Sequence, residues 1–480
     1  MGVRTAEEYL SGLRDGRTVF FRGARVDDVT THPELRVGAE HTAIDFRLAE
    51  DPRFRELFTA TLPDTHERIS RYFLPPRGMQ DLLIRREMIE TSTREGGGVV
   101  LLVKEIGTDA LFTLTLVTRR VDEQYGTDYL DRVTRYHAYC QAHDLSLAVA
   151  QTDVKGDRSL LPSRQANPDS YVRIVERRPD GIVVRGAKAH TTGTAFTDEV
   201  IVLPTRALSE ADRDYAVAFA VPVNTKGLTL IASPFGFTGS SAFHHPVSSR
   251  HHLVETLTVF DDVFVPNDRV FLAGEWDCAG TLANTFVEFH RYTAISYKPP
   301  LCDLLIGAAA LIAEYNGVAG ASHVREKLTR LIAYTETVRS LTRAAALDCT
   351  IVDGIAVPNT MATNIAKQYF AMHYHEAVRD VQDIAGGLVV TGPSEGDWHN
   401  PATRGYIERY LGGKQGVSTE DRLRAINLIR DLTASDFGGY HEILAIHAEG
   451  SLEAQKITIY RGYDLDRCRA LAKQAAGIGG

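Results

Sequence analysis

The segment TDVKGDRSLLPSRQ, residues 152–165, is the densest group of polar residues in the chain. Acidic and basic side chains crowd there around Gly156 and Pro162. A loop of this kind can offer backbone N–H groups and fixed cations to an anionic or heteroaromatic ligand. The same composition suits a solvated linker between domains, so the residues alone leave two interpretations open.

A second candidate is HRYTAISYKPPLC, residues 290–302. Its terminal residues His290 and Cys302 could form half of a metal site, line a cofactor pocket, or lie at a helix entry. The Pro299–Pro300 pair predicts a stiff, locally extended backbone near its end. The spacing by itself does not choose among these alternatives.

The other cysteines and histidines give weak metal signals. The five cysteines are scattered, without a CxxC or CxxxC pair, so neither a disulfide framework nor a cysteine-rich metal site is expected. Histidines gather in FHHPVSSRHH (243–252) and MHYHE (372–376), but adjacent histidines on a strand point to opposite faces. We expect no metal, and a substrate-entry or surface loop at 243–252.

The length and bulk composition are those of a soluble globular protein. The chain has 480 residues, more than one hydrophobic core usually serves, which predicts two or three packed modules. A net charge of −9 argues against nucleic acid as a partner. The apolar run 304–313 is about half a bilayer span, and the N-terminal segment lacks a secretory signal pattern. We expect a cytoplasmic protein that does not contact membranes.

The order of elements predicts an α+β fold. Residues 40–145 follow a helical pattern, 146–275 contain short alternating runs, and the chain from 281 onward contains long helices. The segment YVRIVERRPDGIVVRG predicts a hairpin that turns at Pro179–Gly181. Because helices and strands are segregated, a doubly wound sheet is not expected. We predict domains at 1–145 (helical), 146–278 (β) and 279–480 (helical bundle and tail).

Several blocks resemble one flavoprotein family. DGRTVFFRGARVDDVTTHP near the start, the loop at 152–165 with the hairpin after it, FDDVFVPNDRVFL, AGGLVVTGPSEGDWHNP and HAEGSLEAQKI span nearly the whole chain. They are similar to the family that joins 4-hydroxyphenylacetate 3-hydroxylases to 4-hydroxybutyryl-CoA dehydratases. This resemblance implies an acyl-CoA dehydrogenase-like fold: an N-terminal helical domain, a central β-barrel and a C-terminal four-helix bundle, assembled as a homotetramer.

The resemblance also implies FAD, bound between the β domain and the bundle. Glycine at the phosphates has a physical reason, because a missing Cβ lets backbone N–H groups come close. The implied cofactor-binding residues are the isoalloxazine loop Thr152, Asp153, Val154, Lys155, Gly156, Asp157 and Arg158, its neighbours Lys188, Thr191 and Thr192, and Gln382, Gly386 and Gly387, which approach the phosphates from a neighbouring subunit.

The chain departs from both branches of the family. The dehydratase branch holds an iron–sulfur cluster with cysteines and one histidine, and those positions fall on Leu101, Glu105, His290 and Tyr297 here. Iron–sulfur clusters depend on cysteine thiolates, so no cluster is expected. The hydroxylase branch carries an Arg-x-x-x-Tyr pair and a histidine before the flavin loop, and neither pattern is present.

Five residues remain as catalytic candidates: His290, Tyr297, Lys298, Glu105 and Arg158. His290 and Arg158 would stabilise charge that develops on the flavin. Tyr297, Lys298 and Glu105 would handle substrate protons, and an apolar environment would raise the pKa of Glu105. Each also has a structural interpretation, as a packing histidine, helix-cap residues or a solvated helix carboxylate.

A flavin without a cluster favours the oxygenase component of a two-component monooxygenase. A separate flavin reductase would supply reduced FAD, and O2 would supply the oxygen atom transferred to a small aromatic or similarly electron-rich substrate. A cluster-free acyl-CoA dehydratase or isomerase is an alternative, because moving a double bond needs chiefly a base and a polarised carbonyl. A flavin-binding scaffold without catalysis is another.

Overall fold

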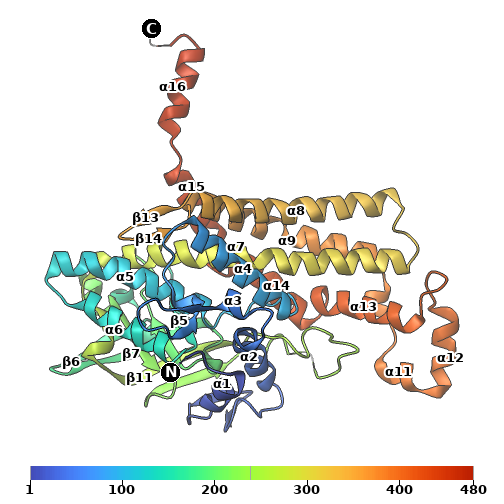
Figure 1. Ribbon diagram of the computed structural model, residues 1–480, viewed down its shortest axis with the longest axis horizontal. Coiled ribbons are helices and arrows are strands. Elements are labelled where there is room, and N and C mark those ends of the chain that lie inside the picture. The colour runs from blue at the N-terminus through green and yellow to red at the C-terminus, as the bar shows by residue number, and fades with distance from the viewer. Residues whose placement is uncertain (1, 238, 479–480) are drawn as a thin grey trace.

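The computed structural model describes residues 2–237 and 239–478 and has the predicted order of helices, strands and helices (Figure 1). Helix α5 is buried over most of its length and ends at Gly126, whose φ of 68° suits a glycine. The N-terminal helices are α1 (Ala6–Gly12), α2 (Arg36–Glu50), α3 (Arg55–Phe58), α4 (Met79–Glu95), α5 (Glu105–Tyr125) and α6 (Tyr129–Ala142), with a small hairpin of β3 (Thr59–Thr61) and β4 (Arg68–Ser70).

The strands of the middle region form two sheets. The six-stranded sheet has the order β2-β1-β10-β11-β7-β6, and the four-stranded sheet has the order β12-β9-β8-β5. The first contains β1 (Val19–Phe21), β2 (Ala24–Val26), β6 (Arg173–Arg178), β7 (Gly181–Thr192), β10 (Leu228–Ala232) and β11 (Glu255–Pro266). The second contains β5 (Leu147–Ala150), β8 (Glu199–Val202), β9 (Val217–Pro222) and β12 (Val270–Ala273).

The predicted hairpin is confirmed, with Arg178 of β6 opposite Gly181 of β7. Strand β1 was not expected: it comes from the N-terminal segment and pairs in parallel with β10, Val19 opposite Leu230. The β region predicted as a barrel is thus built from two sheets, and one of them takes two strands from before residue 30.

Long helices form the C-terminal part. Helices α7, α8 and α9 lie side by side, and α13 packs on α7 and α9 (Figure 1). The elements are α7 (Trp276–Tyr315), α8 (Ser322–Leu347), β13 (Thr350–Val352), β14 (Ile355–Val357), α9 (Thr360–Ala385), α10 (Leu388–Thr391), α11 (Glu395–His399), α12 (Pro401–Tyr410), α13 (Thr419–Thr433), α14 (Asp436–His447), α15 (Leu452–Gly462) and α16 (Leu465–Ala475).

Helix α7 continues through Pro299–Pro300, so the predicted extended backbone is wrong. A proline at position 299 cannot donate the helical hydrogen bond to the carbonyl of Ile295. The hydroxyl of Thr342 on α8, which also bonds to the Val338 carbonyl at 2.8 Å, lies 3.1 Å from the Ile295 carbonyl and is a shared donor to it. Packing of α7 against α4, α5, α8 and α9 holds the rest of the helix in line.

Helix α7 is also apolar and long enough for a membrane span by composition. In the most apolar 18-residue stretch of this helix, 61% is buried inside the protein, as expected for a core helix of a globular protein. Its central part therefore lies where the three regions of the chain meet, and HRYTAISYKPPLC belongs to that part.

Candidate functional site

Tyr297 and Lys298, consecutive on α7, both contact Glu449 in the turn between α14 and α15. The Tyr297 phenol donates to Glu449 Oε1, and Lys298 Nζ lies 3.2 Å from Glu449 Oε2 and 3.2 Å from the phenol oxygen. The side chains of Lys298 and Glu449 are each 2% exposed. Burial and the neighbouring carboxylate raise the pKa of Tyr297 well above its ordinary value, so the phenol stays a proton donor.

The backbone at Glu449 is strained and held in place. Its φ of 57° is in the left-handed region, which costs a residue with a Cβ of the order of 1 kcal/mol. Arg291 Nε donates to the Glu449 carbonyl at 3.0 Å, and Arg291 Nη1 donates to Asn364 Oδ1 at 2.7 Å. The next residue, Gly450, has a φ of 97°, which favours glycine, and a Cβ added there would lie 2.9 Å from Arg291 Nη2. Such strain is typical of functional sites.

Lys367 of α9 adds a second ammonium to this cluster. Its Nζ lies 3.7 Å from Glu449 Oε2 and donates to the Ala445 carbonyl at 3.1 Å. Burial lowers the pKa of Lys367 to about 7, against the opposing effect of Glu449. Burial alone would raise the pKa of Glu449, but Lys298 and Lys367 outweigh it and lower that pKa to about 2. Lys367 can therefore exchange a proton near neutral pH while Glu449 stays ionised.

His290 lies two turns before Lys298 on α7, near Asp109 of α5. Its Nδ1 is 3.6 Å from Asp109 Oδ2, and its ring stacks on Phe286 with a centroid distance of 5.3 Å. Asp109 is fixed by Arg85 Nη2 at 2.7 Å and by the Thr293 hydroxyl at 2.8 Å. His290 is close enough to Glu449 to contribute to the lowered pKa of that carboxyl, which places the imidazole near the same cluster.

Glu105 lies deeper, at the first turn of α5. Its carboxylate accepts from the Tyr72 hydroxyl at 3.3 Å and from the Lys104 backbone N–H at 3.2 Å. Burial, assisted by the charge of Asp45, raises the pKa of Glu105 to about 7, in the direction predicted for an apolar environment. The contacts of Glu105 belong to the N-terminal helices, and its place in proton transfer stays a prediction.

A second buried carboxyl, Glu255, begins β11. Both its oxygens lie 2.9 Å from the Thr192 hydroxyl, and Tyr440 of α14 donates to Oε1 at 2.9 Å. Burial raises the pKa of Glu255 despite these donors. The charges of Glu255 and Tyr440 act on Tyr297, so this group adjoins the Glu449 cluster. The predicted cofactor residue Thr192 is thereby linked to the predicted catalytic residue Tyr297.

Lys188 and Thr191 of the flavin-binding prediction face the protein interior. Lys188 Nζ lies 2.6 Å from Asp153 and donates to the carbonyls of Gln151 and Leu203. The Thr191 hydroxyl bonds to threonine hydroxyls of β11. These contacts fix the loop after β5 to β7, and the part of Lys188 and Thr191 in flavin binding stays a prediction.

The loop 152–158 has the features of a ligand-binding loop. Lys155 and Gly156 have φ values of 77° and 50°, and Gln165 closes the loop by bonding the N–H and C=O of Asp157 at 2.9 and 2.7 Å. Within the described residues, the N–H groups of Lys155 and Gly156 donate no hydrogen bond. Val154 is 44% exposed and apolar. Free N–H groups beside an exposed apolar side chain fit a flavin ring.

Gln382, Gly386 and Gly387 lie at the far end of α9. Gln382 Nε2 donates to the Thr433 carbonyl at 2.7 Å, and the two glycines are exposed. Gly386 ends the helix with a φ of 79°, and no atom lies within 4 Å of a Cβ built on either glycine. This position is open to another molecule, as the neighbouring-subunit prediction requires.

The histidine loop 243–252 is more buried than predicted. His252 is fully buried, and His251 Nδ1 lies 3.3 Å from Nδ1 of His41 on α2. The N–H of Val247 donates to Asp431 of α13 at 2.9 Å, which fixes the loop to the bundle. The surface-loop interpretation is therefore wrong for His252, whereas His244, His245 and His251 are partly exposed. Within 2–237 and 239–478, no three histidine, cysteine or acidic side chains are placed to hold a metal ion.

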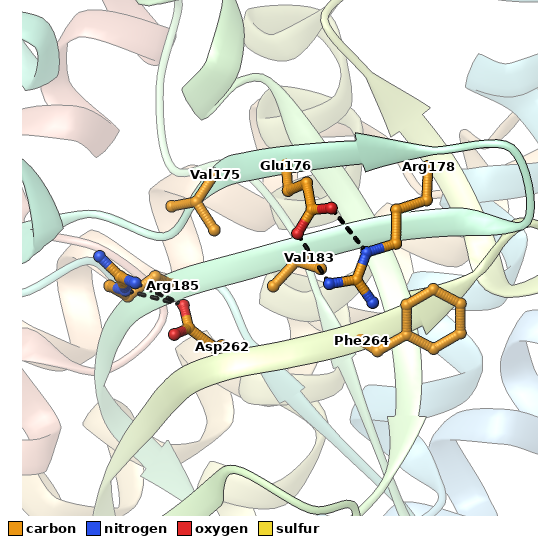
Figure 2. Close-up of a pocket in the computed structure, with 7 residues that line it drawn as sticks. All are labelled: Val175, Glu176, Arg178, Val183, Arg185, Asp262 and Phe264. Atoms are coloured by element: carbon orange, nitrogen blue, oxygen red, sulfur yellow. Dashed lines mark hydrogen bonds and ion pairs between the residues drawn. The ribbon is translucent and has the colours of Figure 1, made fainter.

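A surface cleft of about 330 Å³ lies away from all these residues, on β6, β7 and β11 (Figure 2). Two ion pairs cross it, Arg178 with Glu176 at 2.7 Å and Arg185 with Asp262 at 2.6 Å. Its charges are already paired and it has none of the buried proton-transfer groups, so we place the site at the Glu449 cluster instead.

The chain belongs to the 4-hydroxyphenylacetate 3-hydroxylase family. The family's N-terminal model matches residues 5–272 and its C-terminal model matches residues 279–477. The fold is therefore that of the flavoprotein family expected from the sequence blocks.

Both branches of the family appear among the relatives. A 4-hydroxybutyryl-CoA dehydratase/vinylacetyl-CoA-Δ-isomerase from Clostridium aminobutyricum is 35% identical over 99% of this chain and 100% of that protein. The 4-hydroxyphenylacetate 3-monooxygenase oxygenase component from Thermus thermophilus is 30% identical over 99% of this chain and 98% of that protein.

Solved structures give the same result. An oxygen-tolerant archaeal 4-hydroxybutyryl-CoA dehydratase from N. maritimus superposes with a TM-score of 0.93, at 32% identity, over 100% of this chain and 96% of that chain. The FAD complex of an oxygenase component of 4-hydroxyphenylacetate 3-monooxygenase superposes with a TM-score of 0.91, at 28% identity, over 99% of both chains.

Four residues of the site were missed by sequence reasoning: Asp109, Glu255, Lys367 and Glu449. One of them, Glu449, stands in HAEGSLEAQKI, a block that carried the family resemblance. An acidic residue in a motif that resembles a flavoprotein family could have indicated a site residue at this position. Nothing in the sequence around Lys367 marks it, because its environment is formed by residues far along the chain.

Proposed function

We propose that the protein is the oxygenase component of a two-component monooxygenase, which uses reduced FAD and O2 to hydroxylate a small aromatic or similarly electron-rich substrate. The main support comes from Tyr297. It stands where the resemblance to the dehydratase branch implies a cysteine ligand of the iron–sulfur cluster, and here it is hydrogen-bonded to Glu449 and Lys298. Oxygenase components of 4-hydroxyphenylacetate 3-monooxygenases align with 99% of this chain, and the structure of one of them has been solved with FAD bound. When bound, the reduced flavin would be the group that reacts with O2.

The chain's own residues would hold the ring and manage protons. The loop 152–158 would offer its free N–H groups to the flavin, and Val154 would pack against the ring. Tyr297 would form a hydrogen bond with the substrate, with Glu449 setting the orientation of the phenol. His290, which lies near Asp109, would stabilise negative charge beside the ring.

An iron–sulfur cluster does not fit these residues. Leu101 is a fully buried apolar side chain, and the Tyr297 phenol is already bonded to Glu449. The nearby Cys302 is buried, and burial raises the pKa of its thiol to about 12, so it does not offer a thiolate. Iron analysis of anaerobically purified protein should find far less than one iron per chain.

The test is single-turnover oxygenation. The protein is mixed anaerobically with photoreduced FAD and a panel of phenols, then with ¹⁸O2, and the products are measured by mass spectrometry. The expected result is one ¹⁸O atom in the product with at least one phenol or phenolic thioester. Release of all the oxygen as hydrogen peroxide with every substrate, at the rate of free reduced FAD, would contradict the proposal.

A second candidate function is isomerisation of an acyl-CoA. It is favoured by two buried carboxyls near Tyr297, Glu255 and Glu449, and by the 35% identical relative named for that activity. A β,γ-unsaturated acyl-CoA incubated anaerobically in D2O would then gain deuterium as its double bond moves into conjugation. Absence of exchange in protein that oxygenates phenols would leave only the first function.

The remaining partners are also proposals. A separate flavin reductase would deliver reduced FAD, and the protein would work in the cytoplasm. Assembly as a homotetramer is supported by apolar side chains left exposed on the helical part, among them Met372 (56%), Val390 (77%) and Tyr460 (69%). Helix α16 projects from the body and has no buried residue (Figure 1).

A further inference from the structure

The histidine loop 243–252 is tied to α2 by a pair of imidazoles. His41 of α2 is fully buried, and its Nε2 lies 3.0 Å from the Val100 carbonyl. A carbonyl only accepts, so Nε2 carries the hydrogen and Nδ1 of the neutral ring is left as an acceptor. His251 Nδ1 lies 3.3 Å from that nitrogen and therefore donates to it. The pair exists only while His41 is neutral, because a protonated ring would face His251 with a second N–H.

Glycines bring a third segment against the same two rings. A Cβ on Gly96 would lie 2.9 Å from Cε1 of His41, and a Cβ on Gly97 would lie 2.7 Å from Cδ2 of His251. Only a residue without a side chain allows this close approach. The imidazole pair thus joins α2, the loop and the buried segment that leads to Glu105.

His252, the next residue of the loop, is buried behind the candidate site. Its ring packs edge-on against Phe237 at a centroid distance of 4.4 Å and lies 5.3 Å from the ring of Tyr440, which donates to Glu255. Among the described residues, neither ring nitrogen of His252 has a hydrogen-bond partner. A protonated ring would place two N–H groups there without an acceptor, which is costly in a buried position.

No carboxylate compensates a charge on these rings. Within residues 2–237 and 239–478, His41, His251 and His252 form no ion pair. The acids on the elements packed around them have other partners: Asp45 of α2 binds Lys104 at 3.2 Å, Asp431 of α13 accepts from the Ser248 hydroxyl at 2.6 Å, and Glu255 of β11 accepts from Tyr440 at 2.9 Å. The remaining titratable neighbours, Arg250 and His441, are basic.

We propose that His41, His251 and His252 form an acid-sensitive latch, which holds the loop 243–252 closed on α2 while the three rings are neutral and releases it when they are protonated together. This release goes beyond the proposed function, because it does not depend on which reaction the site performs. Only its effect on catalysis, through Tyr440 and Glu255, rests on that function.

The sign and the steepness of the response follow from the burial of the rings. Burial lowers the pKa of His41 and His252 to about 3 and that of His251 to about 4, whereas a released histidine has its ordinary pKa of about 6.5. The open loop therefore binds more protons below about pH 6.5 and gains population as the pH falls. Each histidine contributes up to about tenfold per pH unit, so three contribute up to about a thousandfold, and the loop opens well above the pKa of any closed ring.

Hydrogen exchange of the oxidised, FAD-loaded protein measures the opening between about pH 7 and about pH 5. The N–H groups of Val247 and Ser248, which donate to Asp431 at 2.9 Å, report on the loop. After correction for intrinsic exchange, their protection should fall with a slope that approaches about three decades per pH unit. His251→Asn keeps an N–H donor for His41 and removes one ionisable ring, so the slope should approach about two.

Two further variants complete the test. His41→Gln keeps the donor to the Val100 carbonyl, and it should also reduce the slope by about one decade per pH unit. His373→Asn removes a partly exposed histidine of α9, which pairs with Glu376, and should leave the slope unchanged.

Loss of protection that is confined to the loop and is reversed at pH 7 supports the latch. An equal slope in the wild type and in His251→Asn would assign the release to another group, such as Asp431, and overturn the proposal. Protection lost to the same extent in the buried helix α5 would also overturn it, because that is general acid unfolding. The measurement needs no substrate, reduced flavin or O2, so a failure here is distinct from a failure of the oxygenation test.

Discussion

Tyr297 donates a hydrogen bond to Glu449, 152 positions later in the sequence. The bond joins the bundle helix α7 to the turn between α14 and α15. The bond combines a neutral acid with a carboxylate that two ammonium groups keep ionised. In the proposed reaction, the substrate is the third group that would exchange a proton with this pair.

Replacement of Tyr297 by phenylalanine tests this bond. Tyr297→Phe should lower kcat by at least tenfold while it destabilises the fold by only about 1 kcal/mol, because Glu449 keeps its two ammonium partners. Tyr292→Phe is the matched control on the same helix, since that phenol donates to the Leu82 carbonyl. The control should lose stability without losing kcat, and equal kcat in both variants would remove Tyr297 from the reaction.

Lys367 should make stability depend on pH above neutrality. Its pKa is about 7 in the folded protein and near its ordinary, higher value when unfolded, so the unfolded chain binds more protons between these values. Wild-type stability should therefore rise with pH in this window relative to Lys367→Met, by up to about 1.4 kcal/mol per pH unit. Urea unfolding of both proteins at about pH 7.5 and about pH 9 measures the difference. A constant difference would mean that Lys367 is charged throughout.

Glu105 should act in the opposite direction. Its folded pKa of about 7 lies above its ordinary value, so the folded state binds more protons between about pH 4.5 and pH 7. Stability contributed by the protonated carboxyl is lost as pH rises through that range. Glu105→Gln keeps the neutral shape and should become more stable relative to wild type from about pH 5 to about pH 7. Parallel unfolding curves at the two pH values would show that the carboxyl is ionised throughout.

The Gly386–Gly387 pair allows a backbone effect to be separated from a ligand effect. A Cβ placed on either glycine would meet no atom within 4 Å, but only Gly386 has a positive φ. Gly386→Ala should cost about 1 kcal/mol of stability or more, and Gly387→Ala should cost close to nothing. If the pair approaches FAD of a neighbouring subunit, Gly387→Ala should still weaken FAD binding. Unchanged FAD affinity in that variant would place the flavin elsewhere.

Local sequence patterns predicted much of the architecture but few of the side-chain contacts within the site. The hairpin around Gly181 and the long helices follow from short-range signals, and the structure has them. Glu449, Lys367 and Asp109 gain their roles from partners on other helices, which periodicity does not report. The Pro299–Pro300 break was wrong for the same reason, because a shared donor to the freed carbonyl, the hydroxyl of Thr342, lies on another helix.

The parallel pairing of β1 with β10 has a consequence for how the chain folds during synthesis. Residues 19–21 leave the ribosome more than two hundred residues before their partner strand at 228–232. Strand β1 can pair at once with β2, but its other edge must stay unpaired until β10 has been made. Such late, long-range pairing slows folding and exposes edges to aggregation. A fragment that begins at residue 146 would lack two strands of its main sheet and should be insoluble when expressed alone.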